Sequence, residues 1–522
     1  MTHTQDTTSL ISETGTMGRI ILSAIARYAA REALADDYVR WTYRELGEQI
    51  ARAVAVLQEQ GLKRGDGIAI LSSNRNEAVA VEHAAMLMGL RYTALHPLAA
   101  KDTHAYVVGD AEVAAVVVDP RVLAYPAADL RSQAPKLRAT LSFGPLDGAT
   151  DILAAMAKVT PQPIKDEGRP RDLVRLLYTG GTTGRPKGVA LRHDTMAITT
   201  VLQASEWDLP DGAPRFLALT PISHASGAMI PTVLMQGGFV RLTQGFASDR
   251  FCKIAEAERI SMTFLVPTMI YVLLDYPDMA KHDLASLQTI IYGAAPITPQ
   301  RLKAGLAAFG SAFVQLYGQT ECPNCITTLR KVDHDPERPE LLKSCGMPSP
   351  LVQVALLDSE LNEVAPGQPG EICVRSPLVM AEYWKNPAAT QEAFRGGWLH
   401  TGDVAIRNGD GYLTIVDRTK DMIISGGFNV YPSEVESALL QHRNVSQACV
   451  IGVPDEKWGE AVTAYVVLKA GASGDADALK ALVKAERGAV WSPKTVHFVD
   501  AIPLTALGKI DRKALRAIAL KG

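Results

Sequence analysis

Residues 178–189 read YTGGTTGRPKGV and follow an apolar stretch, residues 173–178, that predicts a β-strand. Glycines permit tight turns in which consecutive backbone N–H groups point at one anionic group, and the segment has four: Gly180, Gly181, Gly184 and Gly188. Thr182 and Thr183 add hydroxyl donors, and Lys187 adds a positive charge. This is not the P-loop pattern, because Gly188 follows Lys187 where that pattern has Ser or Thr. The segment predicts a phosphate-binding loop at the end of a strand, although a surface turn would explain the glycines alone.

The chain around this loop alternates helical patterns with short apolar runs. Residues 43–61 (YRELGEQIARAVAVLQEQG) are amphipathic and end on glycine, which predicts a helix. Residues 68–73 (IAILSS) and 114–120 (AAVVVDP) predict strands, as do FLALT, MTFLV and TIIYG near residues 216, 262 and 289. This alternation predicts βαβ units that form a parallel sheet.

The pattern changes after residue 350. VQVALLD, GEICVRS and GYLTIVD are strand-like pieces with closely spaced turns, which predicts a smaller antiparallel layer. Residues 447–500 contain three further strand patterns and a helix from about residue 476, which predicts a compact α+β unit. Ser433 and Glu436 have the spacing of a capping box at a helix start. We expect a large α/β domain at residues 1–416, a hinge at 417–420 and a C-terminal domain at 421–522.

Composition limits the class of protein. A chain of 522 residues needs more than one structural unit, and its 47% apolar and 21% charged content is that of a soluble globular protein. Lys plus Arg number 53 against 56 Asp plus Glu, so charge gives no reason to expect a nucleic-acid partner. The six cysteines are scattered, which favours a reducing compartment, and we expect the cytoplasm. The start lacks a secretion signal and no segment has the length of a transmembrane helix, while a homodimer is compatible with the sequence.

The complete string at residues 178–189 resembles the phosphate loop of the adenylate-forming superfamily, which includes acyl-CoA and aryl-CoA synthetases, firefly-type luciferases and adenylation domains of peptide synthetases. Its usual pattern is YTSGTTGxPKG, with Ser where this chain has Gly180. Six further segments resemble motifs of that family in order: PISHASG, YGAAP, YGQTE, WLHTGD, SGGFNVYPSEVE and PLTALGKIDRKALR. The resemblance covers residues 42–515. It implies a large N-terminal domain of α/β subdomains with an added β-rich subdomain, and a small mobile α+β C-terminal domain.

The resemblance also implies site residues. Phosphate contacts would come from Thr179 and the loop, with Thr182 and Lys187 catalytic, and His224 would stand at the wall of the acyl pocket. The adenine would lie among Gly293, Ala294, Ala295, Tyr317 and Gly318, with Thr320 near the α-phosphate and Glu321 holding Mg²⁺. Asp403, Ile415 and Arg418 would contact the ribose region, Lys420 would be the hinge residue, and Gly426 and Gly427 would line the coenzyme A tunnel. Lys509 would be the catalytic lysine of the mobile domain. His224 or Lys509 alone would more simply be structural or surface groups.

The function implied by the resemblance is an ATP-dependent acyl-CoA ligase that uses Mg²⁺ and coenzyme A. An acyl-AMP ligase that loads a carrier protein is the nearest alternative, and a non-catalytic nucleotide-binding regulator or a luciferase-type oxygenase are further ones. The expected pocket segments, residues 225–229, 266–269 and 322–326, are mostly small or apolar. They suit an aryl, phenylpropanoid or medium-chain fatty acid. Cys322 and Cys325 invite a zinc interpretation, but zinc sites use four ligands and no second pair is near, so we expect them to line the pocket.

Replacing the atypical loop residue tests this interpretation. We expect Gly180→Ser to preserve or tighten ATP binding, because the serine hydroxyl would add one phosphate contact, which contributes about 1 kcal/mol. Isothermal titration calorimetry with ATP measures the change. Weaker binding by the variant would mean that residues 178–189 are shaped differently from the phosphate loop that they resemble.

Overall fold

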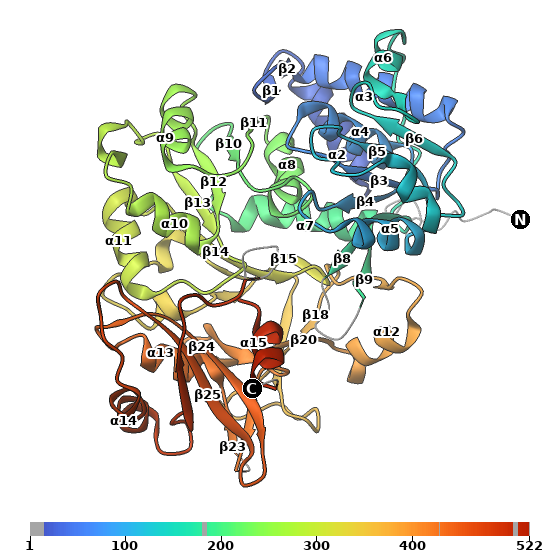
Figure 1. Ribbon diagram of the computed structural model, residues 1–522. Helices are drawn as coiled ribbons and strands as arrows, with labels where there is room; N and C mark the ends of the chain where they lie inside the picture. Colours follow the sequence, from blue (N-terminus) through green and yellow to red (C-terminus); the bar gives the residue numbers. More distant parts are fainter. Residues whose placement is uncertain (1–14, 180–184, 427, 505–509, 521–522) are drawn as a thin grey trace, which may run out of the picture. The chain divides into compact units, whose positions relative to one another are not determined.

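The computed structural model describes residues 15–179, 185–426, 428–504 and 510–520 (Figure 1). Contacts within the chain divide it into two compact units. Unit 1 comprises Met1–Gln353 and Val374–Leu399, and unit 2 comprises Val354–Cys373 and His400–Gly522. The expected hinge at residues 417–420 concerns a motion, and it stays a prediction.

The first sheet of unit 1 contains eight strands in the order β19-β9-β8-β4-β3-β5-β6-β7. The strands from β8 to β7 run parallel, whereas β9 pairs antiparallel with β8 and β19 pairs antiparallel with β9. The strand bounds are β3 (Gly67–Leu71), β4 (Arg91–Leu95), β5 (Val113–Val118), β6 (Ala139–Ser142), β7 (Thr150–Asp151), β8 (Leu173–Thr179), β9 (Lys187–Arg192) and β19 (Glu382–Tyr383). The helices of this part are α2 (Met17–Arg27), α3 (Tyr43–Glu59), α4 (Asn76–Leu87), α5 (Lys101–Asp110), α6 (Ile152–Ala157) and the 3₁₀ helix η1 (Ala127–Gln133).

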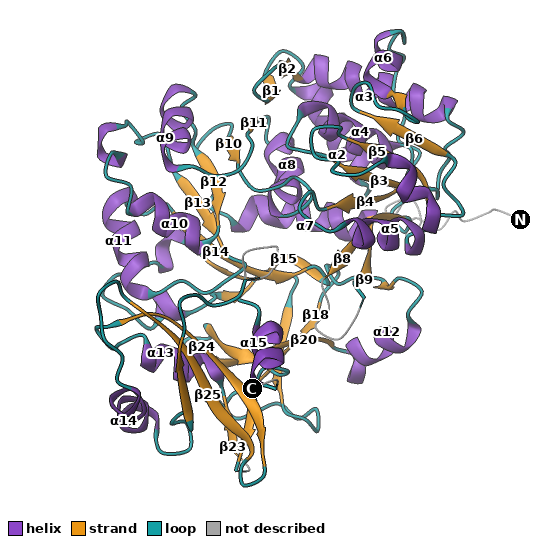
Figure 2. Cartoon of the chain, viewed as in Figure 1, coloured by secondary structure: helices purple, strands orange, loops and turns teal. Residues whose placement is uncertain are grey.

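The second sheet of unit 1 contains nine strands in the order β16-β15-β14-β13-β12-β10-β11-β1-β2, with a parallel centre from β14 to β1. Its strands are β1 (Glu32–Ala35), β2 (Arg40–Thr42), β10 (Arg215–Ala218), β11 (Phe239–Leu242), β12 (Met262–Leu265), β13 (Thr289–Tyr292), β14 (Phe313–Gln319), β15 (Cys322–Leu329) and β16 (Met347–Pro348). The helices are α7 (His193–Glu206), α8 (Ala225–Met235), α9 (Ser248–Ala257), α10 (Pro267–Leu274), α11 (Pro299–Phe309) and α12 (Pro387–Ala393), with 3₁₀ helices η2 (Met279–Lys281), η3 (Lys331–Asp333), η4 (Leu341–Lys343) and η5 (Arg395–Gly397). Figure 2 shows the resulting alternation of strands and helices.

Unit 2 is richer in antiparallel pairing. A four-stranded sheet has the order β17-β18-β20-β21, with β17 (Gln353–Leu357), β18 (Gly370–Arg375), β20 (Leu399–Arg407) and β21 (Leu413–Arg418). A second sheet contains β22 (Ile423–Ser425), β23 (Phe428–Val430), β24 (Val445–Asp455), β25 (Gly459–Leu468) and β26 (Thr495–Phe498). Its helices are α13 (Pro432–Leu439), α14 (Ala476–Arg487) and α15 (Arg512–Ala519). The mixed α/β class, with a large N-terminal and a small C-terminal part, confirms the predicted fold class.

Local signals explain where individual helices begin. Thr42 accepts from the backbone N–H of Glu45, and the Glu45 carboxylate accepts from the backbone N–H of Thr42, so α3 starts with a capping box. The predicted capping box at Ser433 and Glu436 is wrong. Helix α13 begins at Pro432, so Ser433 lies in its first turn, and its hydroxyl donates to the carbonyl of Val416. Glu436 accepts instead from the backbone N–H of Val450.

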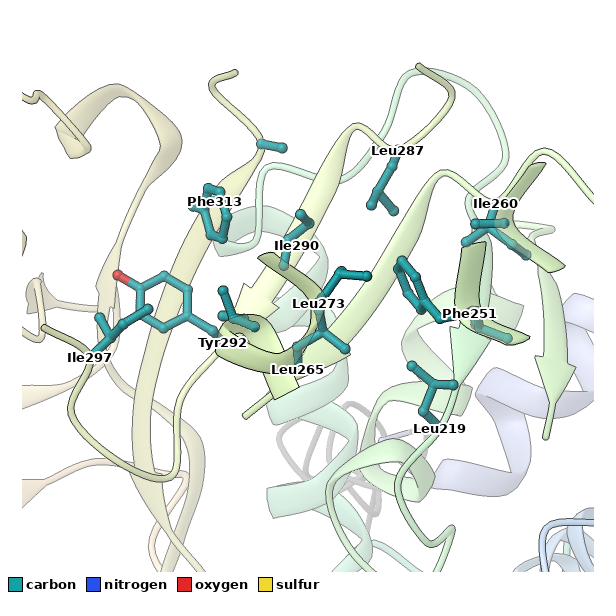
Figure 3. Close-up of a cluster of buried hydrophobic side chains, with 14 of the residues drawn as sticks. Leu219, Phe251, Ile260, Leu265, Leu273, Leu287, Ile290, Tyr292, Ile297 and Phe313 are labelled. Atoms are coloured by element: carbon teal, nitrogen blue, oxygen red, sulfur yellow. The ribbon is translucent and has the colours of Figure 1, made fainter. Parts of the chain in front are cut away.

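A buried cluster supports the carboxyl-end loops of the nine-stranded sheet (Figure 3). Phe313 on β14 and Tyr292 on β13 contact edge to face, with ring centroids 6.0 Å apart. A Cβ atom added at Gly305 on α11 would lie 2.7 Å from the Phe313 ring, so helix and strand pack closely there. Among the described helices, none combines the length and the apolar character that crossing a bilayer requires.

Truncation of Phe313 tests the importance of this cluster. We expect Phe313→Ala to lower the free energy of unfolding by about 3–5 kcal/mol, because it removes a fully buried ring and leaves a cavity. Val332→Ala is the control, since that side chain is 83% exposed. Urea unfolding followed by tryptophan fluorescence compares the two variants, and equal midpoints would contradict the expectation.

Candidate active site

The two ends of the predicted phosphate loop are neighbours on adjacent strands. Thr179 ends β8, Lys187 begins β9, and the two residues are paired across the ladder. The next residue on β9, Gly188, is buried and accepts a hydrogen bond from the backbone N–H of Trp384 at 2.7 Å. Strand pairing therefore places the ammonium-bearing Lys187 beside the start of the loop. The predicted loop residues Gly180, Gly181, Thr182, Thr183 and Gly184 lie outside the described residues.

The predicted adenine segment follows β13 as a strained turn. Gly293 has no room for a side chain, because a Cβ atom there would lie 2.5 Å from the carbonyl oxygen of Leu316. Ala294 has φ 65°, a left-handed conformation that costs a non-glycine residue about 1–2 kcal/mol. Ala294 and Ala295 are exposed. Strain of this kind is typical of functional positions, and small side chains permit a flat ligand to approach the backbone.

The predicted Mg²⁺ carboxylate stands on a tight hairpin. Tyr317 and Gly318 belong to β14, and Thr320 and Glu321 form the two-residue turn to β15, since Gln319 pairs with Cys322. A Cβ atom at Gly318 would lie 2.4 Å from the backbone nitrogen of Asn324, so only glycine fits this crossing. The hairpin places Glu321 at its tip.

Glu321 is joined to Lys187 through Tyr383. The Tyr383 hydroxyl donates to Glu321 Oε1 at 2.7 Å, and Lys187 Nζ lies 4.9 Å from the centroid of the Tyr383 ring. Burial and the adjacent Glu321 carboxylate raise the pKa of Tyr383, so its hydroxyl stays a donor at neutral pH. A carboxylate is the hard oxygen ligand that Mg²⁺ takes together with waters and phosphate oxygens. The half-buried Glu321 beside a lysine therefore fits a metal–triphosphate group.

His224 contacts a second histidine across unit 1. It precedes α8, follows the end of β10, and its ring meets that of His96 edge to face, with centroids 4.6 Å apart. His96 follows β4, so the pair joins the carboxyl ends of strands from both sheets. His224 is exposed, and its Nδ1 lies 3.0 Å from Ser223 Oγ. This position fits a gate or wall residue better than a buried base.

Unit 2 brings the predicted ribose residues together. Asp403 on β20 and Arg418 on β21 are paired across the ladder and form an ion pair at 3.0 Å. Asp403 is 5% exposed, whereas Lys420 is exposed in the turn after β21. Ile415 lies on the same strand as Arg418 and pairs with Ala405.

The part of β20 that precedes Asp403 is held by Glu371. One Glu371 oxygen accepts from the Gly402 N–H at 2.9 Å, and the other lies 2.8 Å from His400 Nδ1. Cys373 Sγ completes a group of three metal-type side chains with Glu371 and His400, but the hydrogen bonds of Glu371 already account for this arrangement. A half-buried carboxylate thus holds the backbone of β20 directly before Asp403.

The predicted tunnel glycine Gly426 has φ 59° and donates its N–H to the carbonyl of Trp458 at 2.7 Å. Gly427 and Lys509 lie outside the described residues. Cys322 and Cys325 are buried free thiols on β15, and burial raises the pKa of Cys322 to about 12. Within the described parts of the chain, neither belongs to the group of three metal-type side chains.

Three contacts of this site have no signal in the sequence. Tyr383, Glu371 and His96 lie in segments that resemble ordinary loops or strands, and each contacts a predicted residue from a distant position.

Comparisons with known proteins agree along nearly the whole chain. Residues 22–384 match the AMP-binding enzyme family, and residues 434–509 match the AMP-binding enzyme C-terminal domain. The chain is 43% identical to a medium/long-chain-fatty-acid–CoA ligase of Mycobacterium tuberculosis, over 96% of this chain and 89% of the relative. It is 36% identical to a feruloyl-CoA synthase of Amycolatopsis sp, over 91% and 93%. An amide bond synthetase from Marinactinospora thermotolerans has a similar structure, with TM-score 0.88, 34% identity and coverage of 96% and 99%. The chain belongs to the AMP-binding enzyme family, within the adenylate-forming superfamily that includes the acyl-CoA synthetases.

Proposed function

We propose that this protein is an ATP-dependent acyl-CoA ligase. A carboxylate attacks the α-phosphorus of ATP and pyrophosphate leaves, and the thiol of coenzyme A then attacks the acyl adenylate and releases AMP. The observation that carries the proposal is that Lys187 and Glu321 both contact Tyr383, and that Lys187 is paired with Thr179 at the start of the predicted phosphate loop. Membership of the family and the names of the relatives as CoA ligases support the same reaction.

The first step needs charge balance rather than a base. A carboxylic acid is already ionised at neutral pH, so no residue has to remove its proton. Lys187 attracts the phosphate oxygens, and Glu321 holds the metal end of the triphosphate. Glu321 would hold Mg²⁺, and the chemistry that the metal would supply is neutralisation of phosphate charge. Catalysis of this step is therefore positional and electrostatic.

The remaining residues orient the nucleotide and the acceptor. Asp403 accepts hydrogen bonds from the ribose hydroxyls, and Arg418 orients its carboxylate through their ion pair. Tyr317 stacks on the adenine beside the Gly293–Ala295 backbone. Lys509 adds a second positive charge during adenylation, and Gly426 with Gly427 leaves room for pantetheine. Rotation of the C-terminal domain about Lys420 switches the enzyme from the adenylation step to the thioester-forming step.

The acid is an apolar one of aryl, phenylpropanoid or medium-chain fatty type. Residues 225–229 form the start of α8, where a Cβ atom at Gly227 would lie 1.8 Å from the carbonyl oxygen of Ile222. Met229, Cys322 and Ile326 are buried, and these segments carry no Asp or Lys to read an amino group. The names of the relatives, which include fatty acid, feruloyl and indoleacetate ligases, fit the same range of acids.

A substrate and acceptor screen tests the proposal. Purified protein is incubated with ATP, Mg²⁺ and hexanoate, octanoate, ferulate, 4-coumarate or indoleacetate, and with coenzyme A, a phosphopantetheinylated carrier protein or no acceptor. We expect release of AMP that depends on both an apolar acid and coenzyme A. AMP release with the carrier protein alone would favour the acyl-AMP ligase instead. Absence of acid-dependent pyrophosphate exchange with every acid would exclude an adenylating enzyme and leave a nucleotide-binding regulator.

The division of labour between the half-reactions depends on Lys509. We expect Lys509→Ala to slow acyl-adenylate formation by about 100-fold or more, because one positive charge is lost from the developing pyrophosphate. Thioester formation from supplied acyl adenylate should change far less. Single-turnover measurements of each half-reaction make the comparison, with Lys513→Ala on the neighbouring helix α15 as the matched control. Equal loss in both half-reactions would refute this role.

A further inference from the structure

Tyr383 lies between two groups of opposite charge. Its hydroxyl donates to Glu321 Oε1 at 2.7 Å, while the face of its ring lies 4.9 Å from Lys187 Nζ. Within the described parts of the chain, Lys187 and Glu321 form no ion pair with each other. One side chain therefore contacts, at its hydroxyl and at its ring face, a carboxylate and an ammonium that would attract one another if they met directly.

The backbone holds Tyr383 in this place from both sides. Strand β19 pairs with β9, so Tyr383 is opposite Val189, two residues after Lys187. The backbone N–H of Met380 donates to the carbonyl of Glu321 at 2.7 Å. The segment of residues 380–384 is thus hydrogen-bonded to the strand after the phosphate loop and to the hairpin that carries Glu321. Tyr383 itself donates its N–H to Thr390 Oγ1 on α12 at 3.0 Å.

Separation of the two charges matters for a metal–nucleotide complex. In a direct salt bridge, Lys187 and Glu321 would neutralise each other. The lysine would then attract phosphate less strongly, and the carboxylate would attract a metal ion less strongly. The ring instead attracts the ammonium weakly through its face, so Lys187 can exchange this contact for phosphate oxygens. The hydroxyl binds one oxygen of Glu321, which orients the carboxylate while its second oxygen has no hydrogen-bond partner among the described residues.

We propose that Tyr383 is a positioning residue that keeps Lys187 and Glu321 apart, so that the lysine reaches the phosphates and the carboxylate reaches the metal of a metal–nucleoside triphosphate. The inference rests on the proposed function, because it assumes that the triphosphate binds beside Lys187. Without Tyr383, Lys187 and Glu321 would pair with each other and neither charge would be available to the ligand.

Two substitutions separate the roles of the hydroxyl and the ring. Tyr383→Phe keeps the ring under Lys187 and removes the hydrogen bond to Glu321. Tyr383→Leu removes both contacts and permits the ion pair. Tyr276→Phe is the matched control, since the Tyr276 hydroxyl also contacts a carboxylate, Asp249 Oδ1 at 3.4 Å, on an exposed face of unit 1.

The measurement is calorimetric binding of α,β-methylene-ATP, with Mg²⁺ and with EDTA. We expect Tyr383→Phe to reduce the tightening of binding by Mg²⁺ about tenfold while binding in EDTA stays near the wild-type value. Tyr383→Leu should weaken binding about fivefold in EDTA as well, because Lys187 then pairs with Glu321. Tyr276→Phe should match the wild type in both conditions.

The outcomes distinguish this inference from the proposed function. Wild-type Mg²⁺ enhancement in Tyr383→Phe, with melting temperature unchanged, would overturn the inference while leaving the ligase intact. Loss of binding in EDTA by Tyr383→Phe, with a lowered melting temperature, would show a merely structural role and also overturn it. If the wild-type protein binds no analogue in either condition, the proposed function itself fails.

Discussion

The antiparallel pairing of β9 with β8 is the interaction on which the candidate site depends. In a purely parallel sheet, a strand ends at one edge and the chain leaves over a helix. Here the chain returns at once, so Lys187 stands opposite Thr179 at the edge where the parallel strands end. The free side of β9 then accepts β19, and this addition brings residues 380–384 to the hairpin of Glu321.

The buried core of unit 1 packs behind the edge of the sheet where the parallel strands end. The buried parallel strands carry continuous apolar runs, and helices enclose clusters such as the one around Phe313 and Tyr292. Groups for chemistry occupy the turns that follow strand ends: Ala294 after β13, Glu321 after β14, and His96 after β4. In unit 2, Asp403 and Arg418 stand opposite each other on the β20–β21 hairpin, and Glu371 accepts a hydrogen bond from Gly402, directly before Asp403.

Much of this arrangement could be predicted from the sequence, because strands and helices follow local patterns. The runs at residues 68–73, 114–120 and 289–293 all form strands, and the helix at residues 43–61 is confirmed as α3. The α/β class and the family were likewise predicted and are confirmed. The site residues themselves stay a prediction, although the structure places Glu321, Lys187 and the Asp403–Arg418 pair at turns and strand ends suited to them.

The contacts that could not be predicted are those between distant segments. Tyr383 lies 62 residues from Glu321 in the chain, and no local pattern specifies which carboxylate its hydroxyl will meet. Ser433 is an example of a local pattern that misled. The S-x-x-E spacing predicted a capping box, but the Ser433 hydroxyl donates to the carbonyl of Val416 on a neighbouring strand instead. Side-chain partners across long separations depend on the register of whole sheets, which a single sequence does not reveal.

The two-residue turn at Thr320 and Glu321 has a consequence for how such a protein can change over time. A carboxylate on a long loop could tolerate insertions, because the loop would absorb them. On this turn, the register of β14 against β15 fixes where residue 321 points, and Gly318 crosses Asn324 with no space to spare. The composition of these strands can therefore change over time, whereas a single insertion between Gly318 and Asn324 would turn the carboxylate away from the Tyr383 hydroxyl.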